Sequence, residues 1–231
     1  MTQAESNQST EQAPDEGVLV YGRVLSAGEL LEEAIKDAVE AMGFEVVVVD
    51  WAGAARHRVV RVYLDVGRDA HSAHGALRVE EVEEVEEVAD GDEGSGAKPK
   101  GITLDDITRL SPIVSNALDA AEADPEATAL QRLLKTGYTL EVSSPGIERP
   151  LAKADHFTRF VGCRVSVRTF EPLEADSKQR GFHGYIKAHE PDPIHPDDPR
   201  GGAVILDEAD GDGTIRIPLT AIKRAHLVYE D

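Results

Sequence analysis

The sequence predicts an α+β protein: an N-terminal α/β domain with two helices and a three-stranded sheet, followed by a small C-terminal β-barrel. Residues 17–143 read in order as helix, strand, strand, helix and strand. The chain after them holds five short runs of β-branched residues separated by Gly, Pro and Asp. At 231 residues, with 41% hydrophobic and 29% charged side chains, the chain suits two globular domains with a tail or an insertion.

The start of the chain predicts a tail and then an amphipathic helix. Residues 1–16 are rich in Gln, Ser, Thr and Glu without apolar periodicity, which favours a disordered tail. Over residues 29–42, apolar side chains recur at helical spacing, with Ser26 placed as the N-cap and Gly43 as the stop. This helix opens an N-terminal domain expected over residues 17–148.

A β-hairpin and an acidic insertion follow the helix. Residues 44–51 are rich in valine and residues 56–66 alternate apolar with polar, which predicts two strands joined by a small-residue turn at 52–55. Residues 69–100 carry acidic pairs every three positions, and their valines drift around a helix instead of forming a stripe. They are predicted to be a flexible acidic insertion, with a partner-binding strip as the alternative.

The second helix and the third strand complete the N-terminal domain. Thr103 and Asp106 have the spacing of a capping box at the start of the helix within residues 101–120. Pro112 lies in the first half of this helix and removes a backbone donor, so a kink is expected there. After a loop near Asp124, residues 137–142 supply the last strand. The apolar face of the helix is formed by Ile107, Leu110, Val114 and Leu118.

The C-terminal domain is expected over residues 149–231. The Asp-Gly-Asp-Gly run at 210–213 marks a hairpin turn between two of its strands. Five short strands in so short a segment predict a barrel, because closing a sheet removes its exposed edges. The predicted strands are residues 163–170, 181–189, 201–208, 213–219 and 223–229.

The stretch SSPGIERPL, residues 143–151, predicts a turn between the two domains. Pro145 suits the second position of a type II turn, and Gly146 supplies the positive φ required at the third. Ser143 and Ser144 lie at a strand end, where a hydrolase nucleophile can lie, but the G-x-S-x-G elbow is absent. The turn is therefore interpreted as an elbow first and a contact surface second.

The sequence lacks the motifs of a metal site, a redox-active cysteine pair, a membrane helix and an RNA-recognition motif. His183, His189 and His195 lie six residues apart, a spacing that does not aim their rings at one metal ion from a strand or a helix. The single cysteine, Cys163, forms no CxxC motif. No stretch approaches the roughly 20 apolar residues that a membrane helix needs. Residues 180–186 differ by one position from an RNA-recognition motif, so Phe182 and Ile186 are expected in a core.

The charge of the chain is strongly acidic and unevenly distributed. The formal net charge of −20 argues against a protein that simply coats nucleic acid. Residues 151–231 nevertheless carry 11 basic and 14 acidic side chains, a net charge of only −3. A local basic face is therefore expected in the C-terminal domain.

Taken together, these stretches resemble the ribosome maturation factor RimP family. Supporting matches are GITLDD at 101–106, AMGFEVVVVD at 41–50, RVYLD at 61–65 and the closing IPLTAIKRAHLV at 217–228. The resemblance runs over nearly all of residues 26–229 except the insertion. Its most specific part is the strand and turn formed by Leu140, Glu141, Val142, Ser143, Ser144, Pro145, Gly146, Arg149, Pro150 and Leu151.

The resemblance implies an α/β domain followed by an SH3/Sm-like small β-barrel, and a factor that is not an enzyme and needs no cofactor. Its implied partners are the immature small ribosomal subunit, through a basic small-subunit ribosomal protein of the decoding region, and nearby small-subunit rRNA. The expected state is a cytoplasmic protein that is a monomer when free and that does not bind membranes. Two rivals from other classes are a general Sm-like RNA-binding regulator and an esterase-like enzyme using Ser143 or Ser144.

The candidate contact residues fall into two groups. The first is the turn of Ser143, Ser144, Pro145, Gly146, Arg149 and Pro150. The second is the set of basic side chains on the predicted barrel, Arg164, Arg168, Lys187, Lys223 and Arg224. Arg149 is expected either to clamp the domains through a carboxylate such as Glu141 or to face rRNA.

Overall fold

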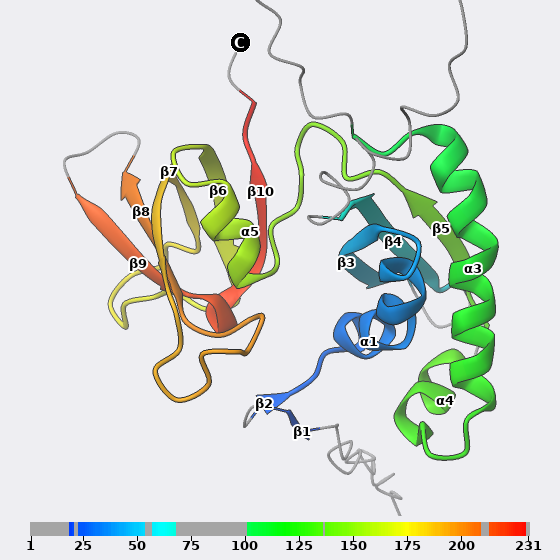
Figure 1. The fold of residues 1–231 in the computed structure, drawn as a ribbon. Helices are drawn as coiled ribbons and strands as arrows, with labels where there is room; N and C mark the ends of the chain where they lie inside the picture. The colour runs from blue at the N-terminus through cyan, green and yellow to red at the C-terminus, as the bar shows by residue number, and fades with distance from the viewer. Residues whose placement is uncertain are drawn as a thin grey trace, which may run out of the picture.

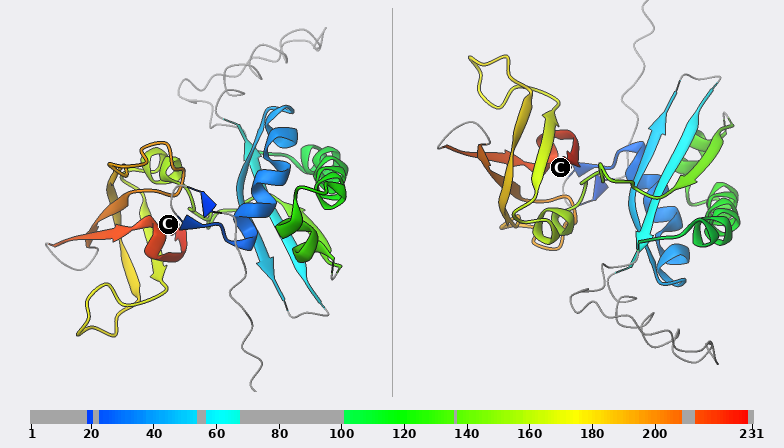
Figure 2. Two further views of the ribbon diagram at one scale, coloured as in Figure 1. Left: turned by 90° about the horizontal axis from the view of Figure 1, so that it is seen from below. Right: turned by 90° about the horizontal axis from the view of Figure 1, so that it is seen from above.

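The computed structural model describes residues 19–20, 23–53, 57–67, 101–135, 137–208 and 213–229. The predicted tail, the acidic insertion and most of the 210–213 turn lie outside these residues. Two bodies lie side by side, an N-terminal α/β domain and a C-terminal β-rich region (Figure 1). A short pair of strands, β1 (Leu19–Val20) and β2 (Arg23–Val24), lies between them in both views of Figure 2.

The α/β domain contains a three-stranded sheet in the order β3-β4-β5. Strands β3 (Phe44–Ala52) and β4 (Val59–Val66) form the predicted antiparallel hairpin, whereas β5 (Thr139–Ser143) runs parallel to β4. A parallel neighbour requires a crossover, which α3 (Leu104–Ala123) and α4 (Thr128–Leu134) provide. The core is shared by α1 (Ala27–Glu40), α3 and one face of the sheet.

Both predicted helix starts are confirmed. Ser26 accepts a hydrogen bond from the backbone of Glu29, whose carboxylate accepts in return from the Ser26 backbone, so α1 begins with a complete capping box. Thr103 and Asp106 make the same reciprocal pair at the start of α3. Gly43, with φ of 82°, ends the turn after α1 as predicted.

Pro112 lies inside α3, which is one uninterrupted helix of 20 residues.

Two helices were not predicted. These are α4 and α5 (Ala154–Arg159), whose N-cap residues, Ala127 and Lys153, make no side-chain hydrogen bond to the helix. Each has one buried apolar side chain, Leu134 in α4 and Phe157 in α5. No helix among the described residues is long and apolar enough to cross a membrane.

The β-rich region contains the five predicted strands in a single antiparallel sheet, ordered β10-β6-β7-β8-β9. Its core contains Phe182 and Ile186, as predicted, together with Phe157 of α5. A short 3₁₀ helix, η1 (Leu219–Ala221), redirects the chain between the last two strands. The strands are β6 (Arg164–Thr169), β7 (Gly181–Glu190), β8 (Ala203–Glu208), β9 (Thr214–Pro218) and β10 (Ile222–Leu227).

The expected closed barrel is not found. Among the described residues no ladder joins β9 to β10, so these two strands remain the edges of an open sheet. The helix η1 lies between these two strands in the chain, and β10 pairs with β6 at the edge opposite β9. The edge of β10 is covered instead by the connecting chain, since Pro150 forms a bridge to His226.

Candidate functional site: the joint between the two bodies

The predicted turn connects the α/β domain to the β-rich region. Ser143 ends β5 and is half-buried, Ser144 is exposed, and Gly146 has the predicted positive φ, at 67°. The chain then runs along β10, because the Leu227 N–H donates to the Arg149 carbonyl at 2.9 Å. The segment after the turn therefore pairs directly with an edge strand of the β-rich region.

Arg149 lies at the centre of the joint and is only 5% exposed. Its guanidinium donates to Glu45 Oε1 at 2.5 Å and to the carboxylate of Asp65, on strands β3 and β4. These two carboxylates are direct cross-strand neighbours, so one arginine bridges an opposed pair of like charges. The suggested partner was wrong, because Glu141 pairs with Arg61 at 2.7 Å.

Three further cations of the β-rich region reach carboxylates of the α/β domain. Lys153 Nζ lies 2.5 Å from Glu32 Oε1, and Arg200 Nη2 lies 2.7 Å from Glu32 Oε2. Arg159 Nη1 lies 3.1 Å from Glu45 Oε1. Arg200 also pairs with Glu29 at 3.1 Å. We call this set the ion-paired joint: Glu29, Glu32, Glu45, Asp65, Arg149, Lys153, Arg159 and Arg200.

A neutral histidine lies beside the cations of the ion-paired joint. His156 is 2% exposed, and its Nδ1 accepts a hydrogen bond from the Ala152 N–H at 3.1 Å. Burial, and then the positive charges of Lys153 and Arg149, lower the pKa of His156 from 6.5 to about 2. The imidazole is therefore an uncharged structural acceptor, and protonating it adds a cation where cations already gather.

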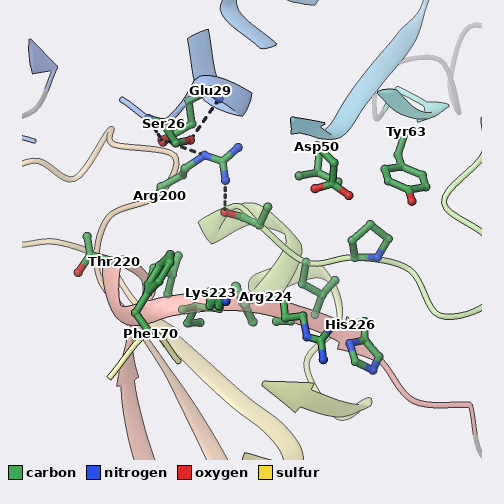
Figure 3. A pocket seen from close by; sticks show the side chains of 18 of the residues that line it. Ser26, Glu29, Asp50, Tyr63, Phe170, Arg200, Thr220, Lys223, Arg224 and His226 are labelled. Atoms are coloured by element: carbon green, nitrogen blue, oxygen red, sulfur yellow. Dashed lines mark hydrogen bonds and ion pairs between the residues drawn. The ribbon is translucent and has the colours of Figure 1, made fainter. Parts of the chain in front are cut away.

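A cavity of about 720 Å³ lies next to the ion-paired joint (Figure 3). Asp50 and Tyr63 line it from the α/β domain, whereas Arg224 and His226 line it from β10. Phe170, 55% exposed, lies at its edge. Burial raises the pKa of the Asp50 carboxyl, and nearby Arg61 partly offsets that effect.

The predicted basic residues do not gather at the ion-paired joint. Four of them are exposed on the β-rich region, namely Arg168, Lys187, Lys223 and Arg224, and Arg164 is half-buried. Lys187 pairs with Asp207 at 2.9 Å. Arg168 and Arg224 lie directly opposite each other on β6 and β10.

The histidines considered as metal ligands have separate surroundings in the structure. His189 Nε2 contacts the Gly201 carbonyl at 3.1 Å, and His183 is exposed on β7. Among the residues that the structure describes, no group of three or more His, Cys, Asp or Glu side chains could hold a metal ion.

The carboxylates and most of the cations of the ion-paired joint were missed by sequence reasoning. The hairpin register next to the turn would place Glu45 opposite Val66, and only the register shift between Val46 and Val48 brings Glu45 opposite Asp65. Nothing local indicates which cation arrives, because Arg149 is 84 residues from Asp65.

The family model described as the RimP N-terminal domain matches residues 34–148, about half of the chain. The matched segment begins within α1 and includes Glu45 and Asp65. It ends at Glu148, one residue before Arg149. The ion-paired joint therefore connects the matched domain to the part of the chain that follows it.

Proposed function

Because the chain belongs to the RimP family of ribosome maturation factors, we propose that it binds the immature small ribosomal subunit and promotes the maturation of that subunit. Membership of this family implies an interaction with the small subunit in general. The family is not known for enzymes, and we propose that this chain, too, acts by binding and not by catalysis. The family match is the observation that carries the proposal.

The ion-paired joint supports a specific way of acting. Its contacts link α1, β3 and β4 to the segment after the turn and to Arg200 near β8, so several separate elements hold one interdomain angle. A binder whose two bodies are already oriented loses less conformational entropy on docking. We propose that the protein presents both bodies to the subunit as one preformed surface.

Charge favours a basic ribosomal protein as the main contact. A chain with a net charge of −20 is steered toward a highly basic protein and repelled from bulk RNA. We propose a basic small-subunit protein of the decoding region as the chief partner. A smaller contact to small-subunit rRNA is assigned to Arg164, Arg168, Lys187, Lys223 and Arg224.

The turn residues are assigned to the interdomain elbow. Ser143, Ser144, Pro145 and Gly146 set the direction of the chain, and Arg149 with Pro150 fastens it to both bodies. This supports a domain boundary between residues 148 and 149. We further propose that the β-rich region is an open relative of the SH3/Sm-like barrel, and that the protein is a cytoplasmic monomer when free.

Sedimentation through a sucrose gradient tests the proposal. The tagged protein is expected to travel with free small subunits and to be absent from complete ribosomes. Cells that lack the protein are expected to accumulate immature small subunits. Migration only at the top of the gradient, or equal association with complete ribosomes, contradicts the proposed function.

A second experiment tests the order of the contacts. Pull-downs with purified small-subunit proteins and with bare small-subunit rRNA are expected to recover a basic protein more strongly than RNA. Recovery of RNA alone contradicts that order and favours a general RNA-binding regulator instead.

A further inference from the structure

Two arginines oppose each other on the outer face of the C-terminal sheet. Arg168 of β6 and Arg224 of β10 are direct cross-strand partners. Arg168 follows the buried Val167, and Arg224 precedes the buried Ala225. Because side chains alternate between the two faces of a strand, both arginines point away from the core. Both are exposed, and within the described part of the chain neither has an ion-pair or hydrogen-bond partner for its guanidinium.

Directly opposed like charges destabilise an antiparallel pair, since their Cβ atoms lie only about 4.5–5.5 Å apart. One row of the outer face of the α/β domain avoids this arrangement, because Asp50, Arg61 and Glu141 alternate in sign across three strands. Where the same domain does oppose two like charges, at Glu45 and Asp65, a counter-charge from another element bridges them. The arginine pair lacks that counter-charge.

We propose that Arg168 and Arg224 together bind one backbone phosphate of single-stranded rRNA, an inference that rests on the proposed function and names the ligand of its RNA contact. The negative phosphate would bridge the two positive guanidinium groups, just as the positive Arg149 bridges the two negative carboxylates of Glu45 and Asp65. Two guanidinium forks offer planar, charge-assisted donors to the phosphate oxygens. Arginine suits this task better than lysine because its donors are fixed in direction.

The next rows of the same face offer groups that suit an unpaired strand. His226, Ser166 and His183 are neighbours across β10, β6 and β7, one row from the arginines. Tyr185, 38% exposed, follows one row further along β7. Aromatic and imidazole rings stack on bases that a duplex keeps hidden, so this face favours single-stranded RNA.

The nearby acid on this face is already neutralised. Asp207, the cross-strand partner of Tyr185, pairs with Lys187 at 2.9 Å. Figure 3 shows Arg224 and His226 extending from β10 beside the interdomain cavity, so the phosphate site opens toward the rim of that cavity. A strand held by the arginines can therefore continue along the boundary between the two bodies.

The test compares Arg168→Gln, Arg224→Gln and the double variant with the wild-type chain, using oligouridine of about 12 nucleotides as the probe. Each single change is expected to weaken binding about tenfold, because a charge-assisted contact is lost. In the double variant, the slope of log K against log salt is expected to fall by about 0.7, because the contact to the shared phosphate is lost. The melting temperature without RNA is expected to rise in each single variant, since the repulsion is removed.

Arg216→Gln provides the matched control, because it removes the same charge from the same sheet at a residue that already pairs with Glu190 at 2.8 Å. Its affinity for oligouridine is expected to stay within about twofold of wild type, because Arg216 lies on β9, at the opposite edge of the sheet from Arg224. The inference is overturned if wild-type protein does not bind oligouridine, if the double variant binds as the control does, or if the single variants melt at a lower temperature.

The same variants separate this inference from the proposed function. Wild-type protein that travels with free small subunits, combined with arginine variants that bind oligouridine normally, overturns the phosphate site alone. Wild-type protein that stays at the top of the gradient overturns the proposed function, whatever oligouridine does.

Discussion

Replacing Arg149 by methionine tests whether the ion-paired joint stabilises the fold. Methionine keeps an unbranched apolar stem but is shorter than arginine and lacks the guanidinium. Glu45 and Asp65 then face each other across β3 and β4 with little access to water, since their side chains are 19% and 16% exposed. We expect a marked loss in the free energy of unfolding at neutral pH.

The size of the loss follows from the geometry. Removing one partner of a buried ion pair costs about 3–5 kcal/mol, because the remaining charge is left uncompensated. Arg159 still reaches Glu45 at 3.1 Å and shields part of that charge. The expected loss for Arg149→Met is therefore at the lower end, about 3 kcal/mol.

Urea unfolding followed by the fluorescence of Trp51, the single tryptophan, measures this loss in the α/β domain. Arg61→Met is the matched control, since Arg61 and Glu141 form an exposed pair, 38% and 46% accessible, worth at most about 1 kcal/mol. Adding Asp65→Asn to the methionine variant is expected to restore stability, because it removes the opposed charge. Equal losses for the two methionine variants, or a further loss with Asp65→Asn, refute the reasoning.

Three more predictions concern stability. The folded state keeps His156 unprotonated, with a pKa of about 2 against 6.5 when unfolded, so stability falls as pH falls below 6.5. The slope rises toward about 1.4 kcal/mol per pH unit as the unfolded-state histidine becomes fully protonated near pH 5, and His156→Asn is expected to remove this contribution in urea titrations between pH 5 and 6.5. A Cβ added at Gly184 meets the Asp207 carbonyl oxygen at 2.2 Å, whereas at Gly181 of the same strand nothing lies within 4 Å. Gly184→Ala is therefore expected to cost about 1–3 kcal/mol or more in thermal unfolding, with Gly181→Ala nearly neutral; equal effects contradict the close approach of β8 to Gly184. Thr103→Ala is expected to cost about 1 kcal/mol of unfolding free energy through the lost cap, and no loss contradicts the capping role.

Local signals account for the parts of the fold that the sequence predicted well. Both capping boxes, the valine-rich hairpin and the five C-terminal strands depend on neighbours within a few residues, which a single sequence displays. Helices α4 and α5 lack such signals, because Ala127 and Lys153 make no side-chain cap and the helices are short. Their stability comes from packing by Leu134 and Phe157, which only the tertiary structure supplies.

The sequence predicted the position of the joint along the chain, but not the residues that form its ion pairs. The Pro-Gly turn indicated an elbow, and Arg149 was singled out within it. Its true partners lie 84 and 104 residues away, and Arg200 finds Glu32 at a separation of 168. Such contacts depend on how two folded bodies meet, which no local pattern encodes. The same holds for Arg168 and Arg224, whose opposition follows from the return of β10 to β6.

Two like-charged pairs on neighbouring strands thus have different roles. The Glu45–Asp65 pair is bridged by Arg149 of the same chain, and this contact links the two bodies. The Arg168–Arg224 pair has no such partner among the described residues, which leaves it for an external anion. The two pairs are linked through the backbone. The Arg149 carbonyl accepts a hydrogen bond from the Leu227 N–H of β10, the strand that carries Arg224. Since Arg149 itself is 5% exposed, we expect Arg149→Met to leave the affinity for oligouridine unchanged in protein that remains folded, while Arg168→Gln lowers it. A joint loss of affinity in both variants contradicts this division between a structural pair and a binding pair.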